Sequence, residues 1–425
     1  MGNVALPILV PRMKWQQYSC HGCGVCCRDF TVQLREEDLL KLEEQSWDRI
    51  LGESPIVHFR GSPYLKRNDD GSCVFLKEDG LCRIHADHGF AAKPIACQVF
   101  PFNLAPGESK LRVGVNYLCR SVQENKGAEL ETHLPDLRRF AEELPELAAP
   151  APEARLARGL EPASRRERQA LLSVLDGWLL SDDIAFSVRL DGVAWIAQSL
   201  GNARLDDVRE DRFTDLVRLL GEALPGELEL LPIEPPTGRQ SALLRQASFA
   251  RTEDPRINDG NRHRGRLMTT LSQLRRNRSM RRGRGLTPKL SVVLPEGVDF
   301  RAIEGVGPFV ESPDSSEIYE LCLRWIRSSL HGSRLWGSAH YGWSIVDGLQ
   351  SMVLNIACAG WIARLCSAAD SRPMVRLEDV RTGIGRVDRH AGRAPWLGSP
   401  IELVRLRYLR LDDGLRRILR ANWSS

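Results

Sequence analysis

The sequence predicts an α+β protein in which a small cysteine-rich module of short strands and loops precedes a mainly α-helical domain. Eight of the 11 cysteines fall within the first 119 residues, among short alternating runs and loops rich in Gly, Pro and Asp. After residue 165, apolar residues instead recur every three or four positions, which is the period of amphipathic helices. We therefore expect a cysteine-cluster domain at 13–125, a linker at 144–164 and a mainly helical domain at 165–425.

The first domain contains two segments that alternate polar and apolar residues as half-buried strands do. They are 28–34 (RDFTVQL) and 109–119 (SKLRVGVNYLC). Segment 35–47 (REEDLLKLEEQSW) is expected to be a helix, because its acidic residues crowd the first turn, where the helix dipole favours them. Loops carry the cysteines between these elements.

The linker at 144–164 is rich in Pro and Ala. Beyond it, apolar periodicity predicts helices at 165–180, 183–200, 211–224, 315–331, 343–367 and 398–421, with a loop at 229–239. The most apolar stretch, 343–363, contains Asp347, Gln350 and Asn355, so we expect a buried helix and no membrane span.

Composition is that of a soluble globular protein, with 42% hydrophobic and 27% charged residues. The net charge of +4 indicates no particular partner. The first residues lack a basic region followed by a long apolar run, so no signal peptide is expected. We expect a cytoplasmic chain, in which thiols stay reduced.

Four cysteines lie within the octet CHGCGVCC at 20–27. In a reducing compartment, such a cluster is typical of metal ligation and not of disulfides. The candidate metal ligands are the eight N-terminal cysteines: Cys20, Cys23, Cys26, Cys27, Cys73, Cys82, Cys97 and Cys119. The other three, Cys322, Cys358 and Cys366, lie in apolar helical sequence and are expected to pack as small hydrophobes.

The C-x2-C spacing brings two sulfurs to one metal, and Cys20, Cys23 and Cys26 repeat it. Cys27 directly follows Cys26, so it either faces a second centre or completes the first from another angle. Zinc and iron–sulfur clusters such as [4Fe–4S] both take four thiolates, and the C-x2-C-x2-C order favours iron–sulfur. The nearby histidines are expected to be outer hydrogen-bond partners or exposed; they are His21, His85 and His88.

The Arg-rich segment 260–289 has nine Arg, one Lys and no acidic residue. Two interpretations remain open. One is a solvated or mobile segment. The other is an anion site for a phosphate, a carboxylate or an acidic partner surface. Nucleic acid is not favoured, because no aromatic residues interleave with the arginines.

The sequence assigns no catalytic residue. No Ser/His/Asp or Cys/His arrangement can be argued for, and no Gly-rich turn after a strand offers a nucleotide cradle. His340 and the run Asp388-Arg389-His390 lie beside apolar helices. Either could line a pocket, although interior or exposed histidines of no special role explain both.

The segments CHGCGVCC, CVFLKEDGLCRIH and KPIACQVFPF together resemble the YkgJ-like cysteine-cluster family, whose members are described as zinc- or iron-chelating domains. The octet matches the family's opening motif, and the resemblance covers about the first 120 residues. The later matching positions are Cys73 and Cys82 in the middle pair, Pro94, Cys97, Phe100 and Pro101 in the closing motif, and Cys119, where a further cysteine often appears.

Two features depart from the short members of that family. Gln98 stands where they usually have Arg, and ADHGFAAK (86–93) separates the middle and closing motifs. The longer spacing, followed by a helical half, is similar to flagellin lysine-N-methylases, which use S-adenosylmethionine to methylate lysines on a protein substrate.

Three functions therefore remain open. The first is a metal-binding protein that holds an iron–sulfur cluster or zinc through its N-terminal thiolates. The second, implied by the resemblance, is an S-adenosylmethionine-dependent protein lysine N-methylase. The third is a zinc-stapled adaptor that binds an acidic partner through the Arg-rich segment.

Overall fold

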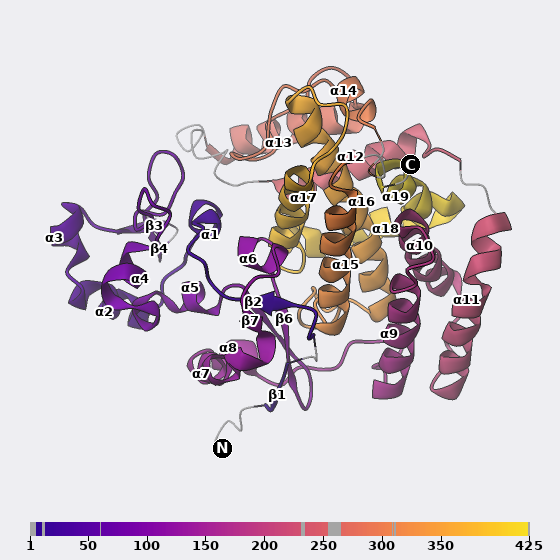
Figure 1. The fold of residues 1–425 in the computed structure, drawn as a ribbon, viewed down its shortest axis with the longest axis horizontal. Coiled ribbons are helices and arrows are strands. Elements are labelled where there is room, and N and C mark those ends of the chain that lie inside the picture. The colour runs from indigo at the N-terminus through magenta and orange to yellow at the C-terminus, as the bar shows by residue number, and fades with distance from the viewer. Residues whose placement is uncertain are drawn as a thin grey trace. The chain divides into compact units, whose positions relative to one another are not determined.

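The computed structural model describes residues 6–10, 13–59, 61–230, 234–253, 265–307, 309 and 312–423. The chain divides into two compact units, unit 1 (Met1–Pro150) and unit 2 (Ala151–Ser425) (Figure 1). Unit 1 combines short strands with short helices, whereas the described part of unit 2 contains helices and no strand. The predicted α+β class is confirmed.

The described residues of unit 1 form three small sheets. In the largest, the order is β1-β6-β5, with β1 parallel and β5 antiparallel to the central strand. Strands β2 and β7 form an antiparallel pair, as do β3 and β4. The strands are β1 (Ile8–Leu9), β2 (Gln17–Tyr18), β3 (Ile56–Phe59), β4 (Ser62–Leu65), β5 (Phe102–Pro106), β6 (Leu111–Val115) and β7 (Ala128–Glu129). The strand predicted within 109–119 is confirmed as β6.

The other predicted strand, 28–34, does not form. The first helix continues to Asp29, and only Gln33 makes an isolated bridge. Val32 and Leu34 are nevertheless buried as their alternation predicted. Residues 28 and 29 belong to the first helix, so the predicted strand cannot begin at residue 28.

The helices of unit 1 are short. They are α1 (Val25–Asp29), α2 (Glu36–Glu44), α3 (Trp47–Leu51), α4 (Arg83–His88), α5 (Ile95–Val99), α6 (Arg120–Gln123), α7 (Leu134–Glu143) and α8 (Pro145–Ala148), with 3-10 turns η1 (Phe90–Ala92) and η2 (Leu130–His133). The helix predicted within 35–47 is confirmed as α2. Its first turn carries Glu36, Glu37 and Asp38, and the Arg35 N–H donates to Asp38 Oδ2 at 3.1 Å.

A small apolar core in unit 1 lies beside the cysteine-bearing loops. Its centre is Trp47, whose ring lies 5.0 Å from that of Phe75. Cys73, Cys82 and Cys97 pack against this core. Three of the eight cysteines are therefore positioned by ordinary apolar burial.

Unit 2 consists of longer helices. They are α9 (Arg165–Leu179), α10 (Phe186–Asn202), α11 (Asp211–Leu230), α12 (Gly238–Thr252), α13 (Gly265–Arg282), α14 (Phe300–Glu304), α15 (Ser315–His331), α16 (Ile345–Ala369), α17 (Leu377–His390), α18 (Pro400–Leu409) and α19 (Gly414–Trp423), with 3-10 turns η5 (Pro395–Gly398) and η6 (Leu411–Asp413). The five helices predicted between 165 and 367 are confirmed as α9, α10, α11, α15 and α16.

Helix α16 is the core of unit 2, and it packs against α10, α12, α17 and α19. It is long and apolar enough to cross a membrane, but 78% of its most apolar window is buried inside the structure. Its polar side chains Gln350 and Asn355 are buried with it and find partners, Gln350 Nε2 donating to Ala197 O at 3.2 Å and Asn355 accepting from Arg251. A core helix accounts for this segment.

The single helix predicted at 398–421 is wrong, because the chain forms two helices there. Asp412 and Asp413 have φ angles of 49° and 53°, in the left-handed region that ends a right-handed helix. Gly414 then starts α19 so close to α18 that a Cβ on it would lie 2.6 Å from Leu409 O. A turn without a side-chain atom is needed at this point.

The prediction also missed four helices of unit 2, α12, α13, α14 and α17. In α17 the buried positions include Gly383, Gly385 and Arg386, which give no apolar signal. A Cβ on Gly383 would lie 2.3 Å from Ala359 O, so α17 packs on α16 by close backbone approach. This kind of packing is not visible in a pattern of large apolar residues.

The predicted linker, 144–164, contains helix α8, the boundary between the units and a bridge between Arg155 and Pro162. Within the Arg-rich segment 260–289, residues 265–282 form α13, which packs against α12. Residues 260–264 lie outside the described part of the chain.

Candidate metal centre

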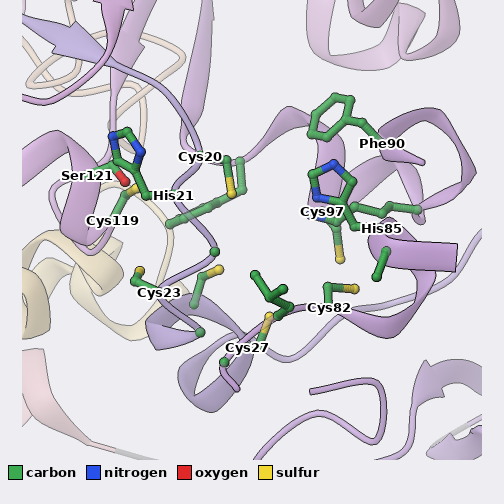
Figure 2. Close-up of a pocket in the computed structure, with 18 of the residues that line it drawn as sticks. Cys20, His21, Cys23, Cys27, Cys82, His85, Phe90, Cys97, Cys119 and Ser121 are labelled. Atoms are coloured by element: carbon green, nitrogen blue, oxygen red, sulfur yellow. The ribbon is translucent and has the colours of Figure 1, made fainter. Parts of the chain in front are cut away.

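The eight predicted ligand cysteines line two neighbouring cavities of unit 1, and none forms a disulfide. The large thiol cavity, of about 260 Å³, is lined by every one of the eight except Cys73. The small thiol cavity, of about 40 Å³, is lined by Cys26, Cys27, Cys73, Cys82 and Cys97. Figure 2 shows the large cavity, with Cys23 and Cys119 on one side and Cys82 and Cys97 on the other.

Two glycines shape the octet. Cys20 and Cys23 lie in the loop before α1, and Cys26 and Cys27 lie in its first turn. Gly22 and Gly24 have φ angles of +66° and +70°, which L side chains rarely adopt. A Cβ on Gly22 would also lie 2.4 Å from Leu81 Cδ2. The glycines thus let the octet turn tightly against the loop that precedes Cys82.

Cys73 and Cys82 are positioned by backbone pairing. Isolated bridges join Arg67 to Cys73 and Leu76 to Cys82, and the Cys73 N–H donates to Cys27 O at 2.8 Å. Backbone N–H groups also point at both sulfurs, from Phe75 to Cys73 and from His85 and Ile84 to Cys82. Such N–H···S bonds stabilise thiolates that ligate a metal.

Cys97 lies in α5, and Cys119 caps the N-terminus of α6. The backbone N–H groups of Val122 and Ser121 lie near the Cys119 sulfur and lower its pKa, against the larger effect of burial. Gln98, which stands where short relatives have Arg, is buried and donates from Nε2 to Ala91 O at 3.0 Å. Its role in this chain is to hold the turn ahead of α5.

In the metal-free state, burial keeps most of these thiols protonated. Burial raises the pKa of Cys73 and of Cys119 to about 12, and it raises the pKa of Cys97 well above its ordinary value. The pKa of Cys27 moves in the opposite direction. A hydrogen bond from the Cys26 thiol, helped by the charges of Lys93 and other nearby cations, lowers its pKa to about 7. Metal binding would therefore release protons.

Lys93 is a buried cation in the walls of both cavities, and the sequence analysis did not identify it. Burial opposes its charge, but nearby Cys97, Cys82, Cys20 and Cys26 outweigh that effect and raise the pKa of Lys93. Its place directly before the closing motif was the available signal. A fixed positive charge offsets the negative charge of thiolates.

The histidines near the cysteines differ in position. His21 and His85 line the large thiol cavity, whereas His88 packs its ring 5.4 Å from that of Trp47. His21 is exposed, with Nε2 3.4 Å from Lys126 O. His85 lies edge-on to Phe90, and burial followed by the charge of Lys93 lowers its pKa.

Among the described residues, no group of three or more Cys, His, Asp or Glu side chains lies at metal-binding spacing. The sulfurs line the cavity walls, so binding requires them to converge further. The donor set still fits a thiolate-bound metal, since eight sulfurs, N–H donors to three of them and a buried cation gather in one region.

Another cavity, in unit 2, shows where some of the polar residues noted beside the late helices lie. His340 and Asp388 do line a cavity of unit 2, but its volume is about 10 Å³. That is room for roughly one water molecule. The cavity is too small for a substrate.

Comparison with known proteins identifies the class of this region. Residues 19–126 match the model of the CxxCxxCC family, described as "Putative zinc- or iron-chelating domain". This confirms the resemblance to the cysteine-cluster family for that part of the chain. The matched range includes all eight cysteines.

One relative is uncharacterized protein MJ0939 of Methanocaldococcus jannaschii, 29% identical over 112 residues. The aligned segment covers 26% of this chain and 38% of the relative. No solved structure matches the chain significantly. Because the family match ends at residue 126, the similarity of unit 2 to flagellin lysine-N-methylases, and with it S-adenosylmethionine binding, stay predictions.

Proposed function

We propose that unit 1 is a metal-binding domain whose N-terminal thiolates hold iron as an iron–sulfur cluster. The observation that carries the proposal is the gathering of eight reduced cysteines around two neighbouring cavities. The family description supports zinc or iron chelation in general.

The size of the large thiol cavity favours a cluster over a single ion. At about 260 Å³ it is several times larger than the share of volume of one water molecule, roughly 30 Å³. A lone zinc ion bound by four thiolates would leave most of this volume empty. A cluster with several iron and sulfide atoms would use it.

The bound centre supplies thiolate–metal bonds, and this chain's residues supply the rest. Gly22 and Gly24 fix the turn of the octet, and backbone N–H groups stabilise the sulfurs of Cys73, Cys82 and Cys119. Because the donors come from segments distant in sequence, binding energy becomes folding energy for unit 1.

Purification of the full chain without air tests this proposal. We expect iron and acid-labile sulfide in equal amounts and broad visible absorption from thiolate-to-iron charge transfer. Cys23→Ala should lower the metal content, whereas Cys366→Ala, in unit 2, should leave it unchanged. Colourless protein that contains zinc and no iron would contradict the cluster, and unchanged metal in Cys23→Ala would contradict the assigned ligands.

A second candidate function, recognition of an acidic partner, is favoured by the surface of α13. This helix exposes Arg275, Arg278 and Arg282, and no ion pair is recorded for them within the described residues. Met268, Leu271 and Leu274 are exposed on the preceding turns of the same helix. An apolar stretch continued by exposed cations fits an acidic, partly apolar protein segment.

Binding of a fluorescent acidic peptide to the full chain tests this candidate. The Arg275→Ala/Arg278→Ala double variant should bind about tenfold more weakly, with a smaller dependence on salt. The control is Arg204→Ala/Arg301→Ala, which removes two exposed arginines outside α13. Equal losses in both double variants would indicate a general effect of net charge and would contradict a site on α13.

A further inference from the structure

We infer that the eight cysteines form two separate four-thiolate metal centres. The first centre would use Cys20, Cys23, Cys26 and Cys119, and the second Cys27, Cys73, Cys82 and Cys97. This inference rests on the proposed function and specifies the number of centres and the ligands of each.

The two cavities distinguish four of the ligands, whereas Cys26, Cys27, Cys82 and Cys97 line both. Cys20, Cys23 and Cys119 line the large thiol cavity and not the small one, whereas Cys73 lines only the small one. Figure 2 shows Cys23 and Cys119 together, apart from Cys82 and Cys97. One four-ligand centre cannot use the cysteines at both ends of this arrangement.

The first group is brought together by a strand pair. Strands β2 and β7 pair through Tyr18 and Ala128, and the Ser19 N–H donates to Lys126 O at 3.0 Å. These contacts fix the chain entering the octet beside the segment that leaves α6. Cys119 directly precedes α6 and lines the large thiol cavity together with Cys20 and Cys23.

The second group is brought together by the apolar core and one backbone hydrogen bond. Cys73, Cys82 and Cys97 pack against the core around Trp47. The bond from Cys73 N–H to Cys27 O adds the octet's last cysteine. Cys97 and Cys73 line the small thiol cavity together with Cys27 and Cys82.

Cys26 and Cys27 stand where the groups meet. Consecutive residues of an α-helix point about 100° apart, so adjacent cysteines in α1 can serve different centres. Cys26 interacts with Cys119 of the first group, whereas Cys73 and Cys97 of the second interact with Cys27. Each group then contains four thiols, the number that a closed zinc site or a [4Fe–4S] cluster takes.

Lys93 relates to both groups. Its charge interacts with Cys97 and Cys82 of the second group and with Cys20 and Cys26 of the first. A cation between two negatively charged centres lowers their mutual repulsion. Its position supports two neighbouring centres better than one.

Metal stoichiometry of the full chain tests the inference without any variant. Anaerobic reconstitution should give about eight iron and eight sulfide per chain, two four-iron clusters, because Cys27, Cys82 and Cys97 of the second group also line the large thiol cavity. If the protein takes zinc instead, titration of the reduced apoprotein with Zn²⁺ should saturate at two equivalents. One cluster or one zinc ion per chain would overturn the two-centre inference and leave the metal-binding function standing. No bound metal would overturn both.

Variants assign the ligands. Cys119→Ala and Cys73→Ala should each lose half of the wild-type metal, and the double variant should lose all of it. Two single variants that each keep half, with a double variant that also keeps half, would show that both cysteines belong to one centre and would overturn the assignment. Should a single variant fail to fold, Co²⁺ titration of the wild-type apoprotein decides, because tetrathiolate absorption should rise linearly to two equivalents.

Discussion

The interior of unit 2 is built around one long apolar helix. The interior of unit 1 near the octet is built from short helices and loops that carry the cysteines. Helix α16 runs for 25 residues and is enclosed by other helices. In unit 1 the segments that carry the cysteines are helices of four to six residues and loops. Short segments bury little apolar area each, so they stabilise one another weakly.

The two interiors also differ in how they treat polar groups. Unit 2 pairs its buried charges with each other, as in the two hydrogen bonds from Arg416 to Asp191. Unit 1 gathers buried thiols whose pKa values are raised by burial, with Lys93 as the cation between them. The interior of unit 2 is therefore held by apolar packing and paired charges, while under the proposed function a metal would add to the small apolar core of unit 1.

Removing the metal should have the largest effect, and it should separate the stabilities of the two units. Chelation under reducing conditions should unfold unit 1 and leave unit 2 folded, because structural thiolate–metal binding supplies on the order of 10 kcal/mol. Limited proteolysis should then cleave within residues 1–150, and calorimetry should keep one transition. Chelator already saturated with metal is the control. Equal cleavage in both units would contradict a folding role confined to unit 1.

Asp191→Ala should have the next largest effect, in unit 2. Arg416 is fully buried, and losing its main partner leaves only the partly exposed Asp413 at 3.7 Å, at a cost of about 3 kcal/mol in the free energy of unfolding. Glu234→Ala is the matched control, since Glu234 is largely exposed and pairs with Arg417. Glu234→Ala should lower the free energy of unfolding, measured in urea, by less than about 1 kcal/mol. Similar losses of stability in the two variants would contradict a larger contribution from the buried pair than from the exposed one.

Asp176→Asn should reveal a pH-dependent part of unit 2's stability. Burial raises the pKa of Asp176, but hydrogen bonds from His331 and Arg327 outweigh it and hold that pKa at about 2, below the ordinary 3.8. Because the folded pKa is depressed, the stabilisation is complete above the unfolded pKa and is lost as pH falls from about 4 to 2.

Urea unfolding at several pH values measures this effect. The variant should be less stable than wild type by about 2 kcal/mol at pH 7, and the difference should shrink towards zero near pH 2. A difference that stays constant with pH would show that Asp176 acts through packing alone.

Lys93→Met should have the smallest effect, and it sharpens the role of charge in unit 1. Loss of the cation should weaken metal retention by about tenfold, measured by competition with a chromophoric chelator. Lys93→Arg keeps the charge and should retain metal more nearly as wild type does. If both variants behave alike, the side chain's shape and not its charge is what matters.

Much of the fold followed from local patterns. The period of apolar residues predicted α9, α10, α11, α15 and α16, and the alternating run predicted β6. The pattern failed where close backbone approach replaces large side chains, as at Gly383 in α17. It failed again where Asp412 and Asp413 take left-handed angles and divide the last predicted helix.

For the site, the sequence by itself determined the candidate donors: eight cysteines with spacings typical of metal ligands, in a stretch that matches the model of a putative chelating domain. Only the tertiary structure decided which of them lie together, since Cys27 meets Cys73 through a backbone hydrogen bond and Cys20 nears Cys119 through a strand pair. It also placed Lys93 in both cavity walls. The physical reason is that ligand type is a local property of the chain, whereas proximity depends on contacts between residues up to a hundred positions apart.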